Sequence, residues 1–232
     1  SRVLDKSEPK YMNSSETPVY SKRRVLYGLN LAKKSKRPNI ILCEGNLDIV
    51  TLHQAGFDNS VASMGTALTV EQTRLLSRFT KELVLCYDND NAGKIATERA
   101  LQILNGSEFS VKVLQLPRRL VDGEYIKQDA DDFIKLQGPD AFERLLNGSE
   151  NGVEFRMAQI AGKYDLKDDE ARIAYCGEVS ELLASLPGAV EREIYTGRAA
   201  EAAGITVEAM KLEVQRSFKR RIAREKRAEL RK

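Results

Sequence analysis

Acidic residues occur in three short groups along this chain, and their types and spacing could bind hard metal ions. The six carboxylates come in pairs: Glu44 and Asp48, Asp88 and Asp90, Asp129 and Asp131. Carboxylate oxygens are the ligands that Mg²⁺ and Mn²⁺ prefer in proteins. Two such ions about 3.5 to 4 Å apart can stabilise both the attacking and the leaving oxygen in phosphoryl transfer. We therefore expect a site for two or more Mg²⁺ or Mn²⁺ ions that acts on phosphate groups.

The composition excludes several other catalytic chemistries. The chain has one histidine, His53, and three cysteines, Cys43, Cys86 and Cys176, without Cys-x-x-Cys spacing. These residues cannot supply a His-dependent hydrolase, a multi-histidine metal site, a zinc ribbon or a disulfide framework. We expect no zinc in this chain, and any chemistry must depend on carboxylates, lysines and arginines.

Each acidic pair taken alone has a simpler explanation. An Asp-x-Asp sequence is more often a turn or a helix cap, and Asp90 or Asn91 could cap a helix that begins at Ala92. A charged loop between helices would explain Asp129 and Asp131. However, two carboxylates about 4 Å apart repel by roughly 4 kcal/mol at an effective dielectric constant near 20. Several carboxylates at one place therefore require protonation or a bound cation, and the first two pairs together favour a cation.

The acidic pairs follow segments that are typical of parallel strands. Four short apolar segments are predicted strands: 40–43, 60–62, 82–87 and 110–116. Helices are predicted between them, at 47–55, from a capping box at Thr69 to Gln72 onward, and at 92–104. Alternating strands and helices imply right-handed crossovers and a mainly parallel sheet with flanking helices. Because the carboxyl ends of parallel strands share one edge, the acidic groups are expected to converge there.

Three regions of the chain differ in pattern and charge. Residues 1–38 are weakly periodic with a net charge of +7, residues 39–137 have the α/β pattern, and residues 138–232 are helical throughout. Residues 216–232 also carry +7, which leaves −11 for the segment between these basic arms within a total of +3. An acidic centre between basic arms suits a cation-loaded site that acts on a polyanion.

The composition is that of a globular protein without a membrane span. Hydrophobic residues make up 42% and charged residues 31% of the 232 residues, and the mean hydropathy is −0.41. No apolar run approaches the ~18 to 20 residues that cross a bilayer, and the start lacks the apolar region of a signal peptide. We expect a cytoplasmic protein. The chain begins without Met and stops within a charged helical pattern, so we expect a piece of a longer protein.

Two of the acidic groups carry a family resemblance. Glu44-Gly45-x-x-Asp48, followed by Asp88-x-Asp90-x-Ala92-Gly93, resembles the TOPRIM signature of bacterial primases, topoisomerases and some nucleases. The glycines beside the acids would let a phosphate or a metal approach closely. The resemblance implies a TOPRIM fold with divalent-metal chemistry on nucleic acids.

Further segments narrow the resemblance to the bacterial DnaG-type primases. Residues 10–17 read Lys-Tyr-Met-Asn-Ser-Ser-Glu-Thr and are similar to that family's Lys-Tyr-Leu-Asn-Ser-Pro-Glu-Thr. Residues 21–29, 64–69 and 129–133 match later motifs of the family in the same order. The resemblance implies the RNA polymerase core of a primase, which makes short RNA primers on single-stranded DNA from ribonucleoside triphosphates.

The resemblance also implies roles for regions and residues. Residues 1–38 would end a basic N-terminal subdomain, residues 39–137 would form the TOPRIM metal-binding domain, and residues 138–232 a helical subdomain. The implied metal ligands are the catalytic Glu44, Asp88 and Asp90, together with Asp48, Asp129 and Asp131. The implied nucleotide- or template-binding residues are Lys10, Asn13 and Lys22.

Parts of the family's full-length protein are expected to be missing. The zinc-binding domain and the helicase-binding domain would lie outside this chain, so the replicative helicase would bind elsewhere and activity of this chain alone would be impaired. As a member of the family the protein would act in the bacterial cytoplasm at replication forks.

Two alternatives keep parts of this interpretation. The same carboxylates could serve nuclease or topoisomerase chemistry, although no tyrosine has a recognisable nucleophile context, and the segment 10–17 favours a primase. The chain could instead be a non-catalytic module in which residues 187–232 bind a partner or DNA. Its basic run at 216–227 is equally well explained as a solvated helix face.

Overall fold

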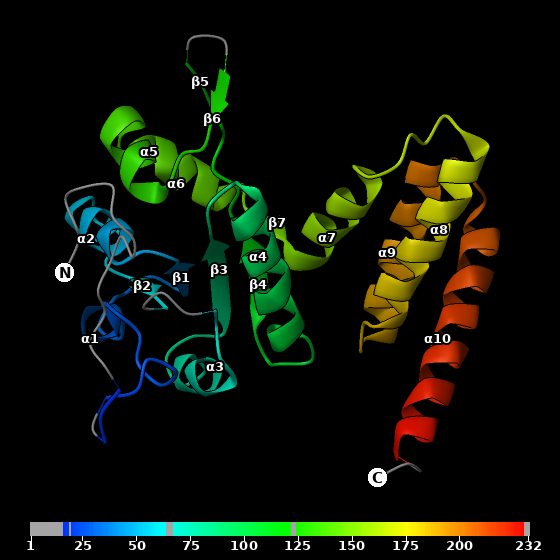
Figure 1. Ribbon diagram of the computed structural model, residues 1–232, viewed down its shortest axis with the longest axis horizontal. Coiled ribbons are helices and arrows are strands. Elements are labelled where there is room, and N and C mark those ends of the chain that lie inside the picture. The colour runs from blue at the N-terminus through cyan, green and yellow to red at the C-terminus, as the bar shows by residue number, and fades with distance from the viewer. Residues whose placement is uncertain (1–15, 19, 64–66, 122–123, 230–232) are drawn as a thin grey trace. The chain divides into compact units, whose positions relative to one another are not determined.

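The structure is a computed structural model that describes residues 16–18, 20–63, 67–121 and 124–229. The chain forms two compact units, whose elements are labelled in Figure 1. Within the described residues, unit 1 comprises those of 1–103 and 114–147, and unit 2 comprises those of 104–113 and 148–232. Unit 2 therefore contains a short segment that lies between two parts of unit 1 in the sequence.

Three parallel strands form the centre of unit 1. They are β1 (Asn39–Cys43), β2 (Ser60–Ala62) and β3 (Glu82–Cys86). Strand β1 lies between the other two, and its Cys43 pairs in register with Ala62 of β2 and with Cys86 of β3. Their apolar runs are almost wholly buried because helices cover both faces of a parallel sheet. The predicted parallel α/β architecture is confirmed, and the carboxyl ends of these strands lie at one edge.

Unit 1 also contains helices before, between and after its strands, and those that follow β1, β2 and β3 agree with the predicted alternation. They are α1 (Leu29–Ala32), α2 (Asn46–Gln54), α3 (Val70–Leu76), α4 (Asn91–Leu104), α5 (Ala130–Gln137) and α6 (Pro139–Asn147). The predicted capping box of α3 is confirmed: Thr69 Oγ1 accepts the N–H of Gln72, and Gln72 Oε1 accepts the N–H of Thr69, both at 3.1 Å. Helix α2 begins directly after the acidic turn that ends β1.

Aromatic and aliphatic side chains from the strands and the helices fill the core of unit 1. Ile41, Val84, Phe57, Phe133 and Phe142 are each at most 1% exposed. The ring of Phe142 on α6 lies edge-on to Phe57 and Phe133, with centroids 4.8 and 6.2 Å away. Burial of each such side chain contributes about 1.5 to 3 kcal/mol. Helix α6 thus packs within unit 1, beyond the domain boundary predicted after residue 137.

The segment that precedes α1 covers the outer edge of β2. Tyr27 and Ala62 exchange two backbone hydrogen bonds of 2.9 and 3.1 Å. On α3 the buried Gln72 donates from Nε2 to the backbone carbonyls of Lys22 (3.0 Å) and Val25 (2.9 Å). These contacts attach residues 22–27 to the sheet and to α3.

A two-stranded hairpin in unit 1 was not predicted. Strands β5 (Arg119–Val121) and β6 (Glu124–Ile126) pair antiparallel, with Leu120 opposite Tyr125. Figure 1 shows this hairpin, hereafter the β5–β6 arm, projecting beyond α5 and α6. Tyr125 is 70% exposed and Leu120 is 59% exposed, so the arm contributes little to the core.

In its described residues, unit 2 combines a small antiparallel ladder with four helices. Strand β4 (Ser110–Val113) pairs with the unpredicted β7 (Glu150–Asn151) and is shorter than the predicted strand at 110–116. The helices are α7 (Gly152–Ala161), α8 (Asp169–Ala184), α9 (Ala189–Ala203) and α10 (Val207–Glu229). The predicted helical character of the C-terminal region is confirmed.

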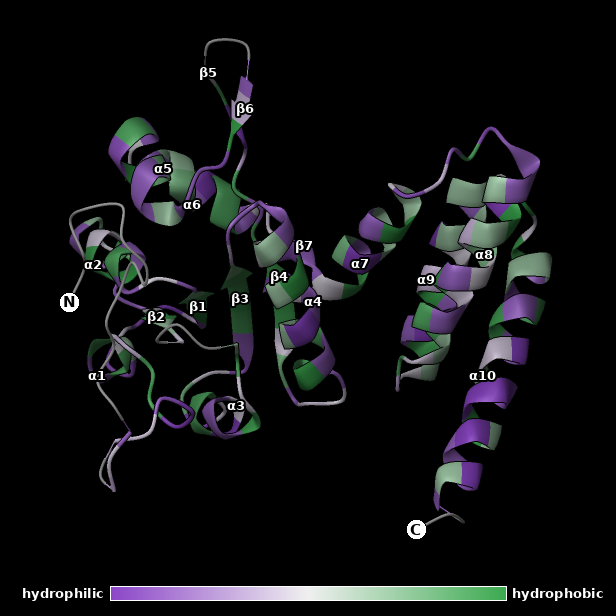
Figure 2. Ribbon diagram, in the orientation of Figure 1, coloured by the Kyte–Doolittle hydropathy of each residue, from purple (hydrophilic) through white to green (hydrophobic). Residues whose placement is uncertain are grey.

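The helices of unit 2 pack through small and aliphatic side chains. Val179 and Leu183 of α8, Ala200 of α9 and Met210 of α10 are completely buried in one cluster. Figure 2 shows that the C-terminal half of α10 is mostly hydrophilic, in agreement with the basic run at 216–227. Among the described residues, no helix is both long enough and apolar enough to cross a membrane.

Candidate metal centre

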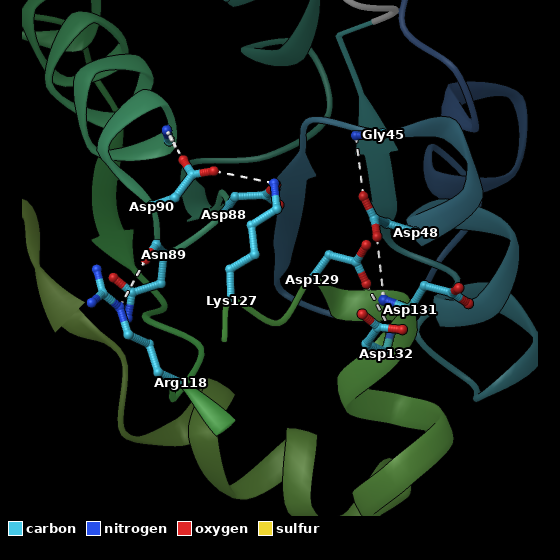
Figure 3. A network of polar contacts seen from close by, with 11 residues as sticks. Gly45, Asp48, Asp88, Asn89, Asp90, Arg118, Lys127, Asp129, Asp131 and Asp132 are labelled. Atoms are coloured by element: carbon cyan, nitrogen blue, oxygen red, sulfur yellow. Dashed lines mark hydrogen bonds and ion pairs between the residues drawn. The ribbon is translucent and has the colours of Figure 1, made fainter. Parts of the chain in front are cut away.

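Asp48 is the third residue of α2, and its carboxylate contacts the turn after β1. Asp48 Oδ2 accepts the N–H of Gly45 (3.1 Å), and Asp48 Oδ1 accepts the N–H of Asp131 (3.2 Å), the second residue of α5. A Cβ on Gly45 would lie 2.7 Å from Asp48 Oδ2, so a residue with a side chain at position 45 would disturb this contact. Asp48 therefore joins the turn after β1 to the start of α5 (Figure 3).

Burial makes Asp48 an unusually weak acid. Its side chain is 7% exposed, and burial, helped by the charge of Asp129, raises its pKa from 3.8 to about 7. Because the pKa is higher in the folded than in the unfolded chain, Asp48 contributes stability while it holds its proton. That contribution is complete below about pH 4 and is lost as the pH rises through the folded pKa near 7.

Glu44 lies between β1 and α2 with part of its carboxylate buried. Its Oε1 finds no hydrogen-bond partner within the described part of the chain. Burial raises the pKa of Glu44, and the negative charges of Asp88 and Asp90 raise it further, while the Asp88 backbone N–H and Lys127 act in the opposite direction. Glu44 is thus electrostatically coupled to the acidic residues that follow β3.

Two carboxylates of the loop after β3, those of Asp88 and Asp90, form ion pairs with the ammonium group of Lys127. Lys127 Nζ lies 3.1 Å from Asp88 Oδ2 and 3.1 Å from Asp90 Oδ2. Figure 3 shows the side chain of Lys127 reaching toward these two residues. These two hydrogen bonds raise the pKa of Lys127. Asn89 attaches the same loop to residues 116–118. Its Nδ2 donates to the Leu116 carbonyl (2.9 Å), and its backbone carbonyl accepts from Arg118 Nε (3.3 Å).

Asp90 has a second contact that fixes the start of α4. Its Oδ1 accepts the N–H of Gly93 at 2.8 Å, and this hydrogen bond lowers the pKa of Asp90, as does Lys127. A Cβ on Gly93 would lie only 2.0 Å from the Asp88 carbonyl oxygen. The close approach of α4 to the Asp88 backbone therefore requires glycine. Asp90 both caps a helix and faces Lys127, so the capping explanation is confirmed, and its role as a metal ligand stays a prediction.

The start of α5 supplies a third acidic group. Asp129 caps the helix, with Oδ1 accepting the N–H of Asp132 (2.8 Å). Carboxylate oxygens of Asp129, Asp131 and Asp132 lie within 4.8 Å of one another, a spacing that a metal ion can bridge. Asp131 is already engaged by Thr51 Oγ1 and by Lys135 Nζ (2.6 Å to Oδ2). Burial raises the pKa of Asp131, but these two hydrogen bonds lower it to a net value below the usual range.

The structure divides the six predicted carboxylates between two neighbouring clusters. Glu44, Asp88 and Asp90 interact around Lys127, and Asp48, Asp129 and Asp131 gather at the start of α5. The charge of Asp88 also raises the pKa of Asp48, so the two clusters are electrostatically connected. Their roles as metal ligands stay a prediction.

The predicted nucleotide-binding residues are only partly described. Lys10 and Asn13 lie outside the described residues. Lys22 is held through its backbone, whose N–H donates to Glu16 Oε1 (3.1 Å) and whose carbonyl accepts from Gln72. Its assignment to nucleotide or template binding stays a prediction.

Three residues of the site did not emerge from the sequence. Asp132 joins the cluster at the start of α5, while Lys127 and Arg118, which flank the β5–β6 arm, bind the loop after β3. The acidity of Asp129-Ala130-Asp131-Asp132 was a signal for Asp132. Lys127 had no such signal in the sequence, because its contact with Asp88 and Asp90 depends on the position of the arm.

The donor atoms of the site fit a hard divalent cation. All are oxygens, and carboxylates of this density require compensating positive charge. Buried polar atoms without a partner in the described part of the chain occur in four residues beside the acids in sequence: Glu44, Asn46, Tyr87 and Gln128. A buried polar atom left unpaired costs about 1 to 3 kcal/mol, so these atoms favour a bound polar ligand.

Three family models match successive parts of the chain. A model described as "DNA primase catalytic core, N-terminal domain" matches residues 1–33, and one described as "Toprim-like" matches residues 41–134. A third, described as "DnaB-helicase binding domain of primase", matches residues 153–208. This last match contradicts the expectation that the helicase-binding domain lies outside the chain.

Curated relatives and solved structures agree with these models. A DNA primase from Clostridium acetobutylicum is 39% identical over 210 residues, which cover 90% of this chain and 34% of the relative. A DNA primase domain from Pseudomonas aeruginosa is 31% identical with a TM-score of 0.73, covering 92% of this chain and 66% of that one. A DnaG primase catalytic domain bound to single-stranded DNA is 31% identical with a TM-score of 0.71, covering 88% and 63%. This chain spans about a third of the length of the curated relatives it matches.

Proposed function

Because the chain belongs to the bacterial DnaG-type DNA primases and corresponds to part of their catalytic core, we propose that it carries the active centre for RNA primer synthesis. The substrates are ribonucleoside triphosphates and a single-stranded DNA template, and the reaction is nucleotidyl transfer. The protein would act in the bacterial cytoplasm, within the primosome at replication forks. The family match over the first 33 residues supports a primase rather than a nuclease or a topoisomerase.

The observation that carries this proposal is the contact of Asp88 and Asp90 with one ammonium group, near a Glu44 whose pKa their negative charges raise. We assign these three as catalytic ligands of Mg²⁺ or Mn²⁺, with Asp48, Asp129 and Asp131 as further ligands. Two or more ions bound there would lower the pKa of the primer 3′-hydroxyl and neutralise charge on the leaving pyrophosphate.

The chain's own residues fix the positions of these ligands. Asp90 is held by the N–H of Gly93, and Asp48 is held by the N–H groups of Gly45 and Asp131. Preorganised carboxylates do not have to reorient during the reaction, which is the condition for efficient electrostatic catalysis. Lys10, Asn13 and Lys22 would bind nucleotide phosphates or template.

Metal binding and nucleotide incorporation test the assignment. We expect the wild-type chain to bind Mn²⁺, measured by the loss of the free-ion electron paramagnetic resonance signal, and to extend a primer on a single-stranded template more slowly than a full-length member of the family. Asp88→Asn and Asp90→Asn should weaken Mn²⁺ binding at least tenfold and abolish extension. Asp140→Asn, an exposed carboxylate on α6, is the control and should behave as wild type. Full extension by Asp88→Asn or Asp90→Asn would refute the assignment.

The match over residues 153–208 favours a second role for unit 2. We propose that this region contacts the replicative helicase. Val190 and Ile194, one helical turn apart on α9, are 74% and 53% exposed and offer an apolar contact. Val190→Asp with Ile194→Asp should weaken helicase binding at least tenfold in isothermal titration calorimetry, while Mn²⁺ binding stays unchanged. Undiminished helicase binding would exclude this face of α9.

A further inference from the structure

Lys127 makes a contact that ordinary surface pairing does not explain. Its single ammonium group lies 3.1 Å from a carboxylate oxygen of Asp88 and 3.1 Å from one of Asp90. These carboxylates are 24% and 33% exposed, while the Lys127 side chain is 59% exposed. The ammonium therefore approaches the pair from solvent and neutralises two residues whose negative charges would otherwise face each other.

The same two oxygens belong to residues that we assign as ligands of a divalent cation. A cation that binds Asp88 Oδ2 and Asp90 Oδ2 together needs the position that Lys127 Nζ occupies, because both must lie within contact distance of the same atoms. Each partly exposed ion pair changes a binding constant by only about 1.4- to 5-fold. Lys127 is thus held firmly enough to compete with a cation and weakly enough to be displaced.

Lys127 also connects the site to the β5–β6 arm. It directly follows β6, and Arg118 directly precedes β5. Arg118 Nε donates to the Asn89 carbonyl at 3.3 Å, so both ends of the arm contact the loop formed by Asp88, Asn89 and Asp90. Displacement of Lys127 would release one of these two contacts.

We propose that Lys127 competes with the divalent cation for Asp88 and Asp90, and that its displacement couples metal loading to the position of the β5–β6 arm. This inference rests on the proposed function, because it requires metal binding at these carboxylates. Lys127 acts as a residue that sets metal affinity. The exposed Tyr125 on β6 makes the arm's response observable.

Direct Mn²⁺ binding to the full chain tests the competition. Lys127→Met should bind Mn²⁺ about two- to thirtyfold more tightly than wild type, the range that two partly exposed ion pairs would give. Lys127→Arg keeps the charge and should stay within about threefold of wild type. Lys163→Met, which removes a comparable surface pair with Glu178 in unit 2, is the control.

The outcomes separate this inference from the proposed function. If wild type binds Mn²⁺ and Lys127→Met binds it equally or more weakly, the competition is wrong while the metal site stands. If neither binds Mn²⁺, the proposed function itself is overturned, and the competition with it. Circular dichroism of each variant verifies that it is folded.

Fluorescence tests the coupling to the arm. The chain contains no Trp, so Tyr125→Trp places a single reporter on β6 at a position that is 70% exposed. Saturating Mg²⁺ should shift the emission of Tyr125→Trp, and the shift should be lost when Lys127→Met is added. No shift in Tyr125→Trp, or an equal shift in both proteins, would show that the arm does not respond to the displacement of Lys127.

Discussion

Replacement of Gly93 by Ala should damage the loop between β3 and α4 through one added methyl group. The new Cβ would lie 2.0 Å from the Asp88 carbonyl oxygen, 2.8 Å from its carbonyl carbon and 3.0 Å from its nitrogen. Ordinary contacts begin at 3.4 Å, so the helix start and the loop must separate by about 1.4 Å. Backbone atoms cannot relieve this contact by changing a rotamer. The movement would also break the 2.8 Å hydrogen bond from the Gly93 N–H to Asp90.

The magnitude follows from three opposing contributions. Overpacking costs about 1 to 3 kcal/mol, and loss of a hydrogen bond to a charged group costs about 1.5 to 3 kcal/mol. The replacement of Gly by Ala in a helix returns only about 0.5 to 1 kcal/mol. We therefore expect Gly93→Ala to lower the free energy of unfolding by about 1.5 to 5.5 kcal/mol. Because Asp88 and Asp90 move apart, Mn²⁺ binding should also weaken at least tenfold.

Urea denaturation followed by far-ultraviolet circular dichroism measures this change. Gly177→Ala on α8 is a matched control, because a Cβ there meets nothing within 4 Å. The control should be neutral or stabilised by about 0.5 to 1 kcal/mol, with unchanged Mn²⁺ binding. If Gly93→Ala unfolds with the same free energy as wild type, the close approach of α4 to Asp88 is not the constraint that we infer.

Three further predictions test the surroundings of the site. In EDTA, the free energy of unfolding of the wild type should fall as the pH rises from about 4 through 7, because the raised pKa of Asp48 makes the folded chain bind this proton more tightly than the unfolded chain does. Asp48→Asn should flatten this slope in urea titrations. If the slope is unchanged in Asp48→Asn, the pH dependence comes from another titratable group. Phe142→Ala should cost about 3 to 5 kcal/mol in the same assay, and a loss below about 1 kcal/mol would contradict the packing of α6. Thr69→Ala should cost about 0.5 to 2 kcal/mol through loss of the α3 cap, whereas Thr69→Ser should retain most of it.

The sheet and its acidic edge could be predicted because local signals and topology agree. The apolar runs of β1 and β3 are continuous, as in strands buried on both faces, and an acidic residue follows within two positions of each, Glu44 after β1 and Asp88 after β3. Parallel pairing then places Cys43 beside Cys86, so the residues that follow them, Glu44 and Tyr87, enter the site together. A short-range pattern was sufficient here, because residues that follow neighbouring parallel strands lie at the same edge of the sheet.

The β5–β6 arm and its contacts could not be derived with the same rule. The Asp122-Gly123 pair between short apolar segments is a local hairpin signal in the sequence. Even with that signal, the pairing of Lys127 with Asp88 and Asp90 depends on where the arm leaves the body of unit 1. Side-chain contacts across such sequence separations follow from tertiary packing, which periodicity does not encode.

The contacts that attach residues 22–27 to β2 have a consequence for shortened versions of this protein. Strand β2 has only three residues, and on the side away from β1 its Ala62 hydrogen-bonds to Tyr27. A version that starts at residue 39 would present that side of β2 as an open edge, to which a second molecule can add a strand. Such a truncation should self-associate, while a version that keeps residues 16–38 should stay monomeric under the same conditions.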